Sequence, residues 1–365
     1  MKPQLLYMAL VAFLAMPSQI FATTNPDFNG AHTKEKTIKK EFTVNSNATL
    51  KVDNSYGNVN IVTYSGNKTT IEVTIKTNSN NEEKAKEKLD EITVEFNATS
   101  DYVSAKTIFN KNNSKSWWNN WGNKNNVNME VNYVIKLPIT NNVDLNNDYG
   151  SINLDKLEGR ANINCDYGKI TTKELMADGN TLSFDYTNNS YFEYIKSGKI
   201  NADYSDYVVN KTKELSINAD YTKSLIKIAE DVTYSCDYGS FTMENVNNLR
   251  GNGDYLTLVL GDVYKNVEIR ADYGSIKIGK MTANAGNVYI QSDYTGITIG
   301  YDAAYNFNFD LSLEYASLRD SDGFEFTKRK EESSNKYYLG HYGSSSTSNL
   351  IKINSDYGSV TFKKN

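Results

Sequence analysis

Ten aspartates recur between residues 148 and 356, and each directly precedes a tyrosine. A regular line of carboxylates could bind Ca²⁺ between neighbours, supply acids for the cleavage of a polysaccharide, or accept backbone N–H bonds from its own turns. The ten residues are Asp148, Asp166, Asp185, Asp203, Asp220, Asp237, Asp254, Asp272, Asp293 and Asp356.

The surrounding sequence favours the backbone role for these aspartates. An enzyme site of this kind needs a local cluster of acids with arginine or lysine, whereas these acids form a uniform line in which arginine is rare. The glycine-rich nonapeptide of calcium-binding β-rolls does not occur, but Ca²⁺ between neighbouring carboxylates stays open as an alternative. The two histidines, His32 and His341, lie near opposite ends of the chain, and neither neighbourhood suggests a metal site or a catalytic triad.

The aspartates belong to a repeat whose most regular member is the tyrosine. The tyrosines lie 17 to 21 residues apart, except for one interval of 42, which equals two units of 21. Four residues before each tyrosine the side chain is bulky and apolar, except at Gly251, and two residues before it is usually small. Glycine often follows, and most copies carry an apolar residue three positions after the tyrosine. The series is Tyr149, Tyr167, Tyr186, Tyr204, Tyr221, Tyr238, Tyr255, Tyr273, Tyr294, Tyr315 and Tyr357.

This pattern predicts a strand, a corner and a second strand in each unit. Alternating apolar positions are typical of strands with one buried face. Counted from the tyrosine, the apolar positions are even-numbered before the corner and odd-numbered after it, so the chain must turn there. The glycine after the tyrosine would supply the unusual backbone angles of that corner. One unit buries its apolar side only by stacking on its neighbours in sequence. We therefore expect an all-β, single-stranded parallel β-helix of about 18 residues per coil, with the tyrosines as an inward ladder of stacked rings.

Two other architectures share part of this pattern. A left-handed hexapeptide helix would show three similar six-residue segments per turn, which are not visible, so we prefer the right-handed form. An antiparallel meander would carry turn signals more often than once per unit. Cys165 and Cys236 occupy the same repeat position four coils apart, about 19 Å at the spacing of neighbouring strands. That is too far for a disulfide, so we predict two free, buried thiols.

The regions outside the repeat have distinct compositions. Residues 1–22 carry a lysine, an apolar run and a small residue, the pattern of a cleaved signal peptide, and 23–42 is expected to be flexible. Residues 43–140 alternate like strands, with a copy of the repeat at NSYGNVNI and a helix at 82–91, and should form a β-layer that caps the end of the coils. The β-helix should then occupy 141–365, with a long excursion at about 322–349.

All three tryptophans, Trp117, Trp118 and Trp121, lie in one polar, asparagine-rich loop. Exposed aromatic clusters often mark binding surfaces for sugars or proteins. The alternative is that the loop folds back and the indoles cover the N-terminal layer.

The chain resembles the putative-adhesin family of bacterial β-strand-repeat proteins. The likeness rests on a leading segment, a strand that ends in proline, and the first regular coil. The matching residues are Leu50, Val52, Tyr56, Gly57, Val59, Leu137, Pro138, Gly150, Ile152 and Leu154. The resemblance covers most of the mature chain and implies a β-helical envelope or surface protein of undefined function, with no catalytic residue to carry over.

Composition narrows the function further. The formal net charge is −5 over 365 residues, which disfavours nucleic acid as a partner. No second long apolar stretch follows the leader, so we expect no transmembrane segment in the mature chain. We expect a non-enzymatic protein, exported to the periplasm, the outer surface or the medium, that binds glycans or proteins as an adhesin-like or scaffolding module. A carbohydrate-active β-helix enzyme and a periplasmic sensor or accessory protein are the alternatives.

Overall fold

The computed structural model describes residues 28–109 and 127–365. The expected signal peptide at 1–22 and the tryptophan loop with Trp117, Trp118 and Trp121 lie outside these residues. The described chain is all-β with one helix, α1 (Glu82–Glu91), over the range expected from the sequence. Asn81 caps this helix by accepting the Lys84 N–H at 3.0 Å. Within the described residues, no helix is long and apolar enough to cross a membrane.

Strands before the regular repeat form the N-terminal part of the fold. They are β1 (His32–Thr43), β2 (Thr49–Ser55), β3 (Val59–Tyr64), β4 (Lys68–Ser79), β5 (Ile92–Ala98), β6 (Tyr102–Phe109) and β7 (Asn128–Pro138).

The repeats and the C-terminal segment supply the remaining strands. They are β8 (Asn142–Asp148), β9 (Ser151–Leu154), β10 (Ala161–Asp166), β11 (Lys169–Leu175), β12 (Asn180–Asp185), β13 (Ser190–Asp203), β14 (Asp206–Asp220), β15 (Lys223–Ser235), β16 (Gly239–Asn252), β17 (Leu256–Val263), β18 (Val267–Asp272), β19 (Ser275–Met281), β20 (Val288–Asp293), β21 (Gly296–Tyr301), β22 (Phe307–Glu314), β23 (Ser317–Arg319), β24 (Phe324–Glu331), β25 (Asn335–Tyr342), β26 (Leu350–Asp356) and β27 (Ser359–Lys364).

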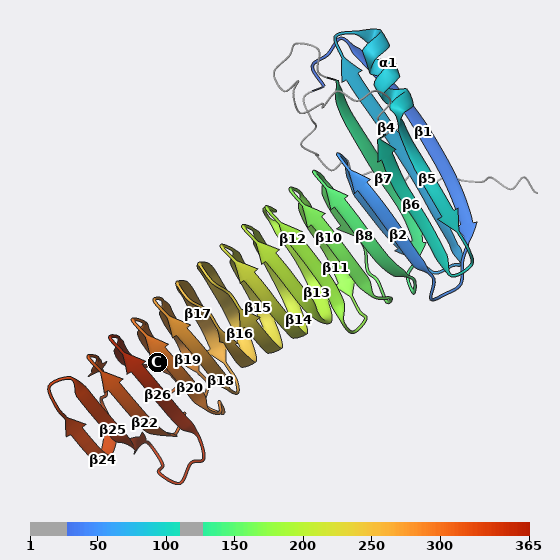
Figure 1. Cartoon of the computed structure of the whole chain (residues 1–365). Helices are drawn as coiled ribbons and strands as arrows, with labels where there is room; N and C mark the ends of the chain where they lie inside the picture. Colours follow the sequence, from blue (N-terminus) through green and yellow to red (C-terminus); the bar gives the residue numbers. More distant parts are fainter. Residues whose placement is uncertain (1–27, 110–126) are drawn as a thin grey trace, which may run out of the picture.

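Strands of successive repeats pair in parallel and in register along an elongated stack (Figure 1). Before the corner, Asp148 is the partner of Asp166; after it, Ile152 is the partner of Ile170. The strands β13 to β16 continue from one corner to the next, and so join the two runs of parallel pairs into one sheet.

Both ends of the sheet are antiparallel, so the sheet as a whole is mixed. At the N-terminal end β4 pairs antiparallel with β1 and β7, and β5 with β6. At the other end β25 pairs antiparallel with β22 and β24. In the described chain β1, β5, β23 and β24 pair on one side only, which leaves the sheet open. The fold is therefore all-β with a mixed sheet, a coarser description than the wholly parallel β-helix expected from the repeat.

The last coil does not stack in chain order, contrary to the expectation that each coil rests on the one before it. The strand β26 lies between β20 and β22 (Figure 1). In the same way β27 lies between β21 and β23. The excursion at 322–349 contains the hairpin β24–β25, which extends the sheet beyond β22. The edge strand β24 carries Lys328, Arg329 and Lys330, and charged edges oppose pairing with another chain.

The prediction of a flexible segment over 23–42 is wrong from His32 onward. Residues His32–Thr43 pair with the whole of β4. The alternation of charged residues in HTKEKTIKKEFT places opposite charges across the pair, as in the ion pair of Lys39 with Glu72 at 2.9 Å. The helix α1 packs against β1 and β4, and the Thr77 hydroxyl donates to the Ala85 carbonyl at 2.6 Å.

The apolar positions of the repeat form one continuous core. Residues four and two positions before the tyrosine are buried, as at Ile200 and Ala202. The exception, Gly251, has a simple cause: a Cβ there would lie 2.3 Å from the ring of Tyr234, the large residue at the same position of the preceding coil. Both cysteines are free and buried, as predicted, and burial raises each thiol pKa to about 12.

Candidate functional site: an external tyrosine ladder

The corner of each repeat is made by the tyrosine itself. The eleven repeat tyrosines and Tyr56 have φ between 48° and 62°, the left-handed region that bulky residues rarely adopt. The prediction that the following glycine supplies this conformation is wrong. The glycine instead allows the backbones of neighbouring coils to lie close together. A Cβ on Gly168 would lie 2.0 Å from the carbonyl oxygen of Gly150 in the neighbouring coil.

The left-handed corner turns the tyrosine side chains outward, so the predicted inward ladder is wrong. Simple alternation would place the tyrosine on the same face as the buried residue two positions earlier. The positive φ breaks that alternation, and aspartate and tyrosine both end on the outer surface. The rings of the eleven repeat tyrosines are 44% to 58% exposed.

The rings stack along the outside of the coils as one ladder. Neighbouring centroids are 4.6 to 5.2 Å apart and their planes agree within 9°. We call this row the tyrosine ladder. Its spatial order is Tyr56, Tyr149, Tyr167, Tyr186, Tyr204, Tyr221, Tyr238, Tyr255, Tyr273, Tyr294, Tyr357 and Tyr315, which follows the displaced last coil.

The aspartates form a second line that binds neighbouring coils together. The Asp203 carboxylate accepts the backbone N–H of Asp220 at 3.1 Å, and the Tyr204 N–H donates to the Asp220 carbonyl at 3.0 Å. The prediction that each carboxylate caps its own corner is therefore wrong, because the donor belongs to the next coil. The carboxylates that accept such a bond are Asp166, Asp185, Asp203, Asp220, Asp237, Asp254 and Asp272.

Burial and neighbouring carboxylates together raise the pKa of two aspartates outside this set, Asp148 and Asp293. Burial, followed by the carboxylates of Asp166 and Asp53, raises the pKa of Asp148. Burial, followed by Asp272 and Asp356, raises the pKa of Asp293. In the ladder, burial and the neighbouring phenols and carboxylates raise the pKa of Tyr186 and Tyr238, which keeps these hydroxyls neutral and able to donate.

Ca²⁺ binding at the aspartates stays the open alternative to the backbone role. Across residues 28–109 and 127–365, no group of three or more histidine, cysteine, aspartate or glutamate side chains could hold a metal ion. A Ca²⁺ ion between two neighbouring aspartates would compete with the inter-coil hydrogen bonds described above. His341 lies 3.4 Å from Glu325, far along the chain from His32 in β1.

The two ends of the ladder differ. At one end Phe109 covers Tyr56 edge-on, with centroids 5.8 Å apart. At the other end a cavity of about 370 Å³ lies against Tyr315, lined by Ser317, Ser334, Lys336 and neighbouring residues. The sequence did not reveal this cavity, because it depends on where the excursion at 322–349 returns to the sheet.

A second hollow, of about 630 Å³, lies on another part of the coils. Asp144, Glu158, Arg160 and Asp178 line it, and none of them belongs to the regular line of aspartates that precede the repeat tyrosines. Glu158, Arg160 and Asp178 lie between strands, whereas Asp144 lies within β8, so no single position of the repeat predicts that the four come together.

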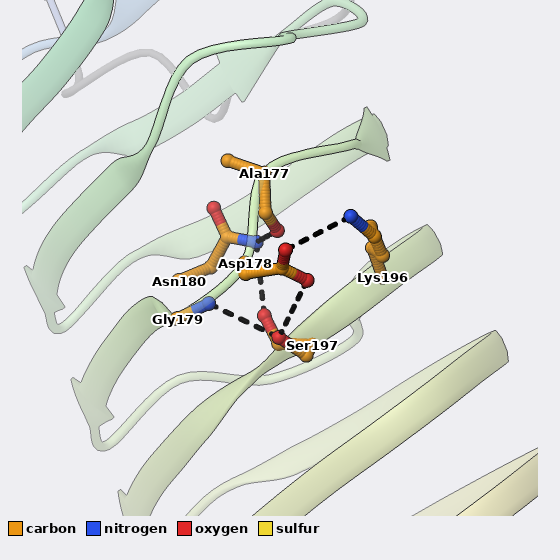
Figure 2. Close-up of polar contacts among 6 residues, drawn as sticks. All are labelled: Ala177, Asp178, Gly179, Asn180, Lys196 and Ser197. Carbon is orange, nitrogen blue, oxygen red and sulfur yellow. Dashed lines mark hydrogen bonds and ion pairs between the residues drawn. The ribbon is translucent and has the colours of Figure 1, made fainter.

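Several polar groups that line this second hollow already have hydrogen-bond or ion-pair partners within the protein. Figure 2 shows the turn beside it: Asp178 pairs with Lys196 at 2.9 Å and accepts from the Ser197 hydroxyl at 3.3 Å. Asn180 donates to the carbonyls of Ala177 and Ser197. The hydrogen bond from Lys196 lowers the pKa of Asp178.

No family model matches the chain, and no curated protein matches it. Among solved structures, it is similar to a putative cell adhesion protein from Clostridium sporogenes (12% identity, 91% of this chain and 100% of that chain, TM-score 0.18). It is also similar to a putative adhesin from Parabacteroides merdae (11%, 90% and 96%, TM-score 0.33) and a putative lipid binding protein from Parabacteroides distasonis (10%, 89% and 96%, TM-score 0.27). These identities and TM-scores are too low to carry a function to this chain.

Proposed function

We propose that this protein is a non-enzymatic, adhesin-like module of the bacterial envelope that binds a surface through the tyrosine ladder. In this proposal the leader at 1–22 directs export, and the repeats form a right-handed, single-stranded parallel β-helix that acts as a rigid support. The observation that carries the proposal is the unbroken row of half-exposed rings on one side of the coils. Aromatic side chains in such positions are enriched at binding surfaces.

The stacking geometry limits what the ladder can offer to a partner. Interior rings such as Tyr221 have both faces covered by neighbours at 4.8 Å. A partner therefore meets ring edges and hydroxyls, repeated once per coil, rather than open ring faces. Weak contacts of this kind become strong when many engage together, because each bound site raises the effective concentration of the next. An extended glycan or a repetitive surface protein suits such a row.

Binding should be tested with the mature chain on a printed glycan array and on intact bacterial cells. The ladder variant replaces Tyr204, Tyr221 and Tyr238 by Asn, which tolerates the left-handed backbone. The control replaces Tyr264 and Tyr289 by Asn; these tyrosines are 43% and 40% exposed but lie outside the ladder. We expect the ladder variant to lose binding and the control to keep it. Equal binding by both variants would contradict the proposal.

A carbohydrate-active enzyme is the second candidate, and one observation favours it. Glu158 and Arg160 line the second hollow together with two further acids. Those acids are ion-paired, Asp144 with Lys51 and Asp178 with Lys196, each at 2.9 Å. Release of reducing ends from the glycans that bind, lost on Glu158→Gln, would establish the enzyme in place of the binding module.

A further inference from the structure

Tyr315 ends the ladder with one ring face uncovered. Its only aromatic neighbour among the described residues is Tyr357, whose centroid lies 4.8 Å away. It is also the most exposed ladder ring, at 58%. Interior rings of the ladder have a stacked neighbour on each side, so the face of Tyr315 is a distinct surface.

Two serines occupy the place where a further coil would put its corner. Interior tyrosines donate their backbone N–H to the carbonyl of an acidic residue in the next coil, as Tyr204 does to Asp220 and Tyr357 to Glu314. Tyr315 donates its N–H to the Ser334 carbonyl instead, at 2.8 Å. Ser333 and Ser334, between β24 and β25, thus replace an aspartate–tyrosine corner but bring no ring. The cavity of about 370 Å³ lies at this position.

The lining of this cavity combines one aromatic surface with hydroxyl groups and a cation. Ser317 and Ser359 bond to each other through their hydroxyls at 3.2 Å, and each keeps further hydrogen-bonding capacity. Lys336 donates to the Ala316 carbonyl at 2.7 Å, which leaves two of its three ammonium N–H groups for a ligand.

We propose that this cavity is a saccharide subsite for an acidic pyranose, such as a terminal uronic acid. The apolar C–H face of the sugar would lie on the open face of Tyr315, its hydroxyls would bond to the serines, and its carboxylate would meet Lys336. A cationic ligand is disfavoured by Lys336, and a purely apolar one by the serines. This inference rests on the proposed function, because it names one ligand class for the end of the same ladder.

The direct test is calorimetric titration of the mature chain with an oligogalacturonate and, in parallel, with a neutral galactose oligomer of equal length. We expect binding of the acidic sugar only. Tyr315→Asn removes the ring at a left-handed position and should weaken binding about tenfold, as expected when a contact of about 1.4 kcal/mol is lost. Lys336→Gln should weaken it by about the same factor, whereas Tyr315→Phe should bind like the parent protein.

One control variant outside the ladder and the triple ladder variant separate this inference from the proposed function. Tyr289→Asn, which lies in β20 outside the ladder, should leave uronate binding unchanged, and melting temperatures check that each variant is folded. If Tyr315→Asn and Lys336→Gln bind uronate like the parent while the triple ladder variant loses surface binding, the subsite is wrong and the proposed function stands. Equal binding of neutral and acidic sugars would overturn the assignment to an acidic pyranose. Failure of the parent protein on the array, on cells and in the titration would overturn both.

Discussion

The tyrosine ladder combines an unfavourable backbone with favourable stacking, and substitution of Tyr221 separates the two. A left-handed backbone costs an ordinary residue about 1–2 kcal/mol, a cost that glycine does not have. Tyr221 has φ of 54° and stacks on two rings at 4.8 Å. Each stacked pair contributes about 0.5–1.5 kcal/mol beyond burial, so the two pairs together contribute about 1–3 kcal/mol.

These magnitudes predict an unusual order of stability. Tyr221→Ala loses both stacks and keeps the strained backbone, so its free energy of unfolding should fall by about 1–3 kcal/mol. Tyr221→Gly loses the same stacks but relieves the strain, so it should be more stable than Tyr221→Ala by about 1–2 kcal/mol. Tyr221→Phe keeps the stacks and should match the parent protein. At ordinary strand positions, a protein with glycine is less stable than the same protein with alanine by about 0.5–1 kcal/mol.

Urea unfolding of the mature chain, followed by circular dichroism, measures this order. The urea midpoints of two variants can be compared only where the dependence of the unfolding free energy on urea concentration is the same. This condition must be checked, because stacked repeats can unfold in parts. Tyr289 provides the matched control, since it is exposed in β20 but is not among the positive-φ residues. There we expect alanine to be more stable than glycine. If alanine were also the more stable substitution at Tyr221, the left-handed corner and the reasoning built on it would be refuted.

Three further predictions concern the glycines and the aspartates. Gly168→Ala should destabilise the chain by at least about 1–3 kcal/mol in urea unfolding, the range for overpacking, because its Cβ would lie 2.0 Å from the Gly150 carbonyl oxygen; a neutral effect would contradict this close approach. The pKa of Asp293 is raised in the folded state, so its stabilising contribution is complete below the unfolded pKa and is lost as pH rises through the folded pKa. Asp293→Asn should therefore raise the melting temperature at neutral pH and reduce the gain on acidification, whereas a lower melting temperature at neutral pH would show that the charge is stabilising. Ca²⁺ should leave the melting temperature of the chelator-treated chain unchanged, since the carboxylates bind backbone N–H groups, and a rise that saturates with Ca²⁺ would favour the metal-binding alternative.

The period and the core could be predicted from the sequence because both depend only on the types of individual residues and their spacing. Ile200 and Ala202 alternate with polar neighbours, so their burial follows from parity alone. The helix at 82–91 could also be predicted, because it follows from a local pattern. The two free thiols could be predicted from the spacing of the cysteines.

The direction of the tyrosines and the order of the last coil could not be predicted in the same way. Parity assumes an extended backbone, and a single left-handed residue reverses the face on which the next side chains lie. Glycine is the usual residue for that conformation, which pointed to Gly168 rather than Tyr167. The position of β26 between β20 and β22 depends on pairing with residues 63 and 42 positions earlier in the chain, which no local pattern predicts. The cavity at Tyr315 follows from that pairing and was missed for the same reason.

A crystal structure of the mature chain, with the conformation of Tyr221 and its neighbours resolved, tests the external ladder most directly. It should show φ near 54° at Tyr221 and its ring on the outer surface, stacked about 4.8 Å from Tyr204 and Tyr238. An extended Tyr221 whose ring lies in the core beside Ala219 would contradict the ladder and the binding surface proposed from it.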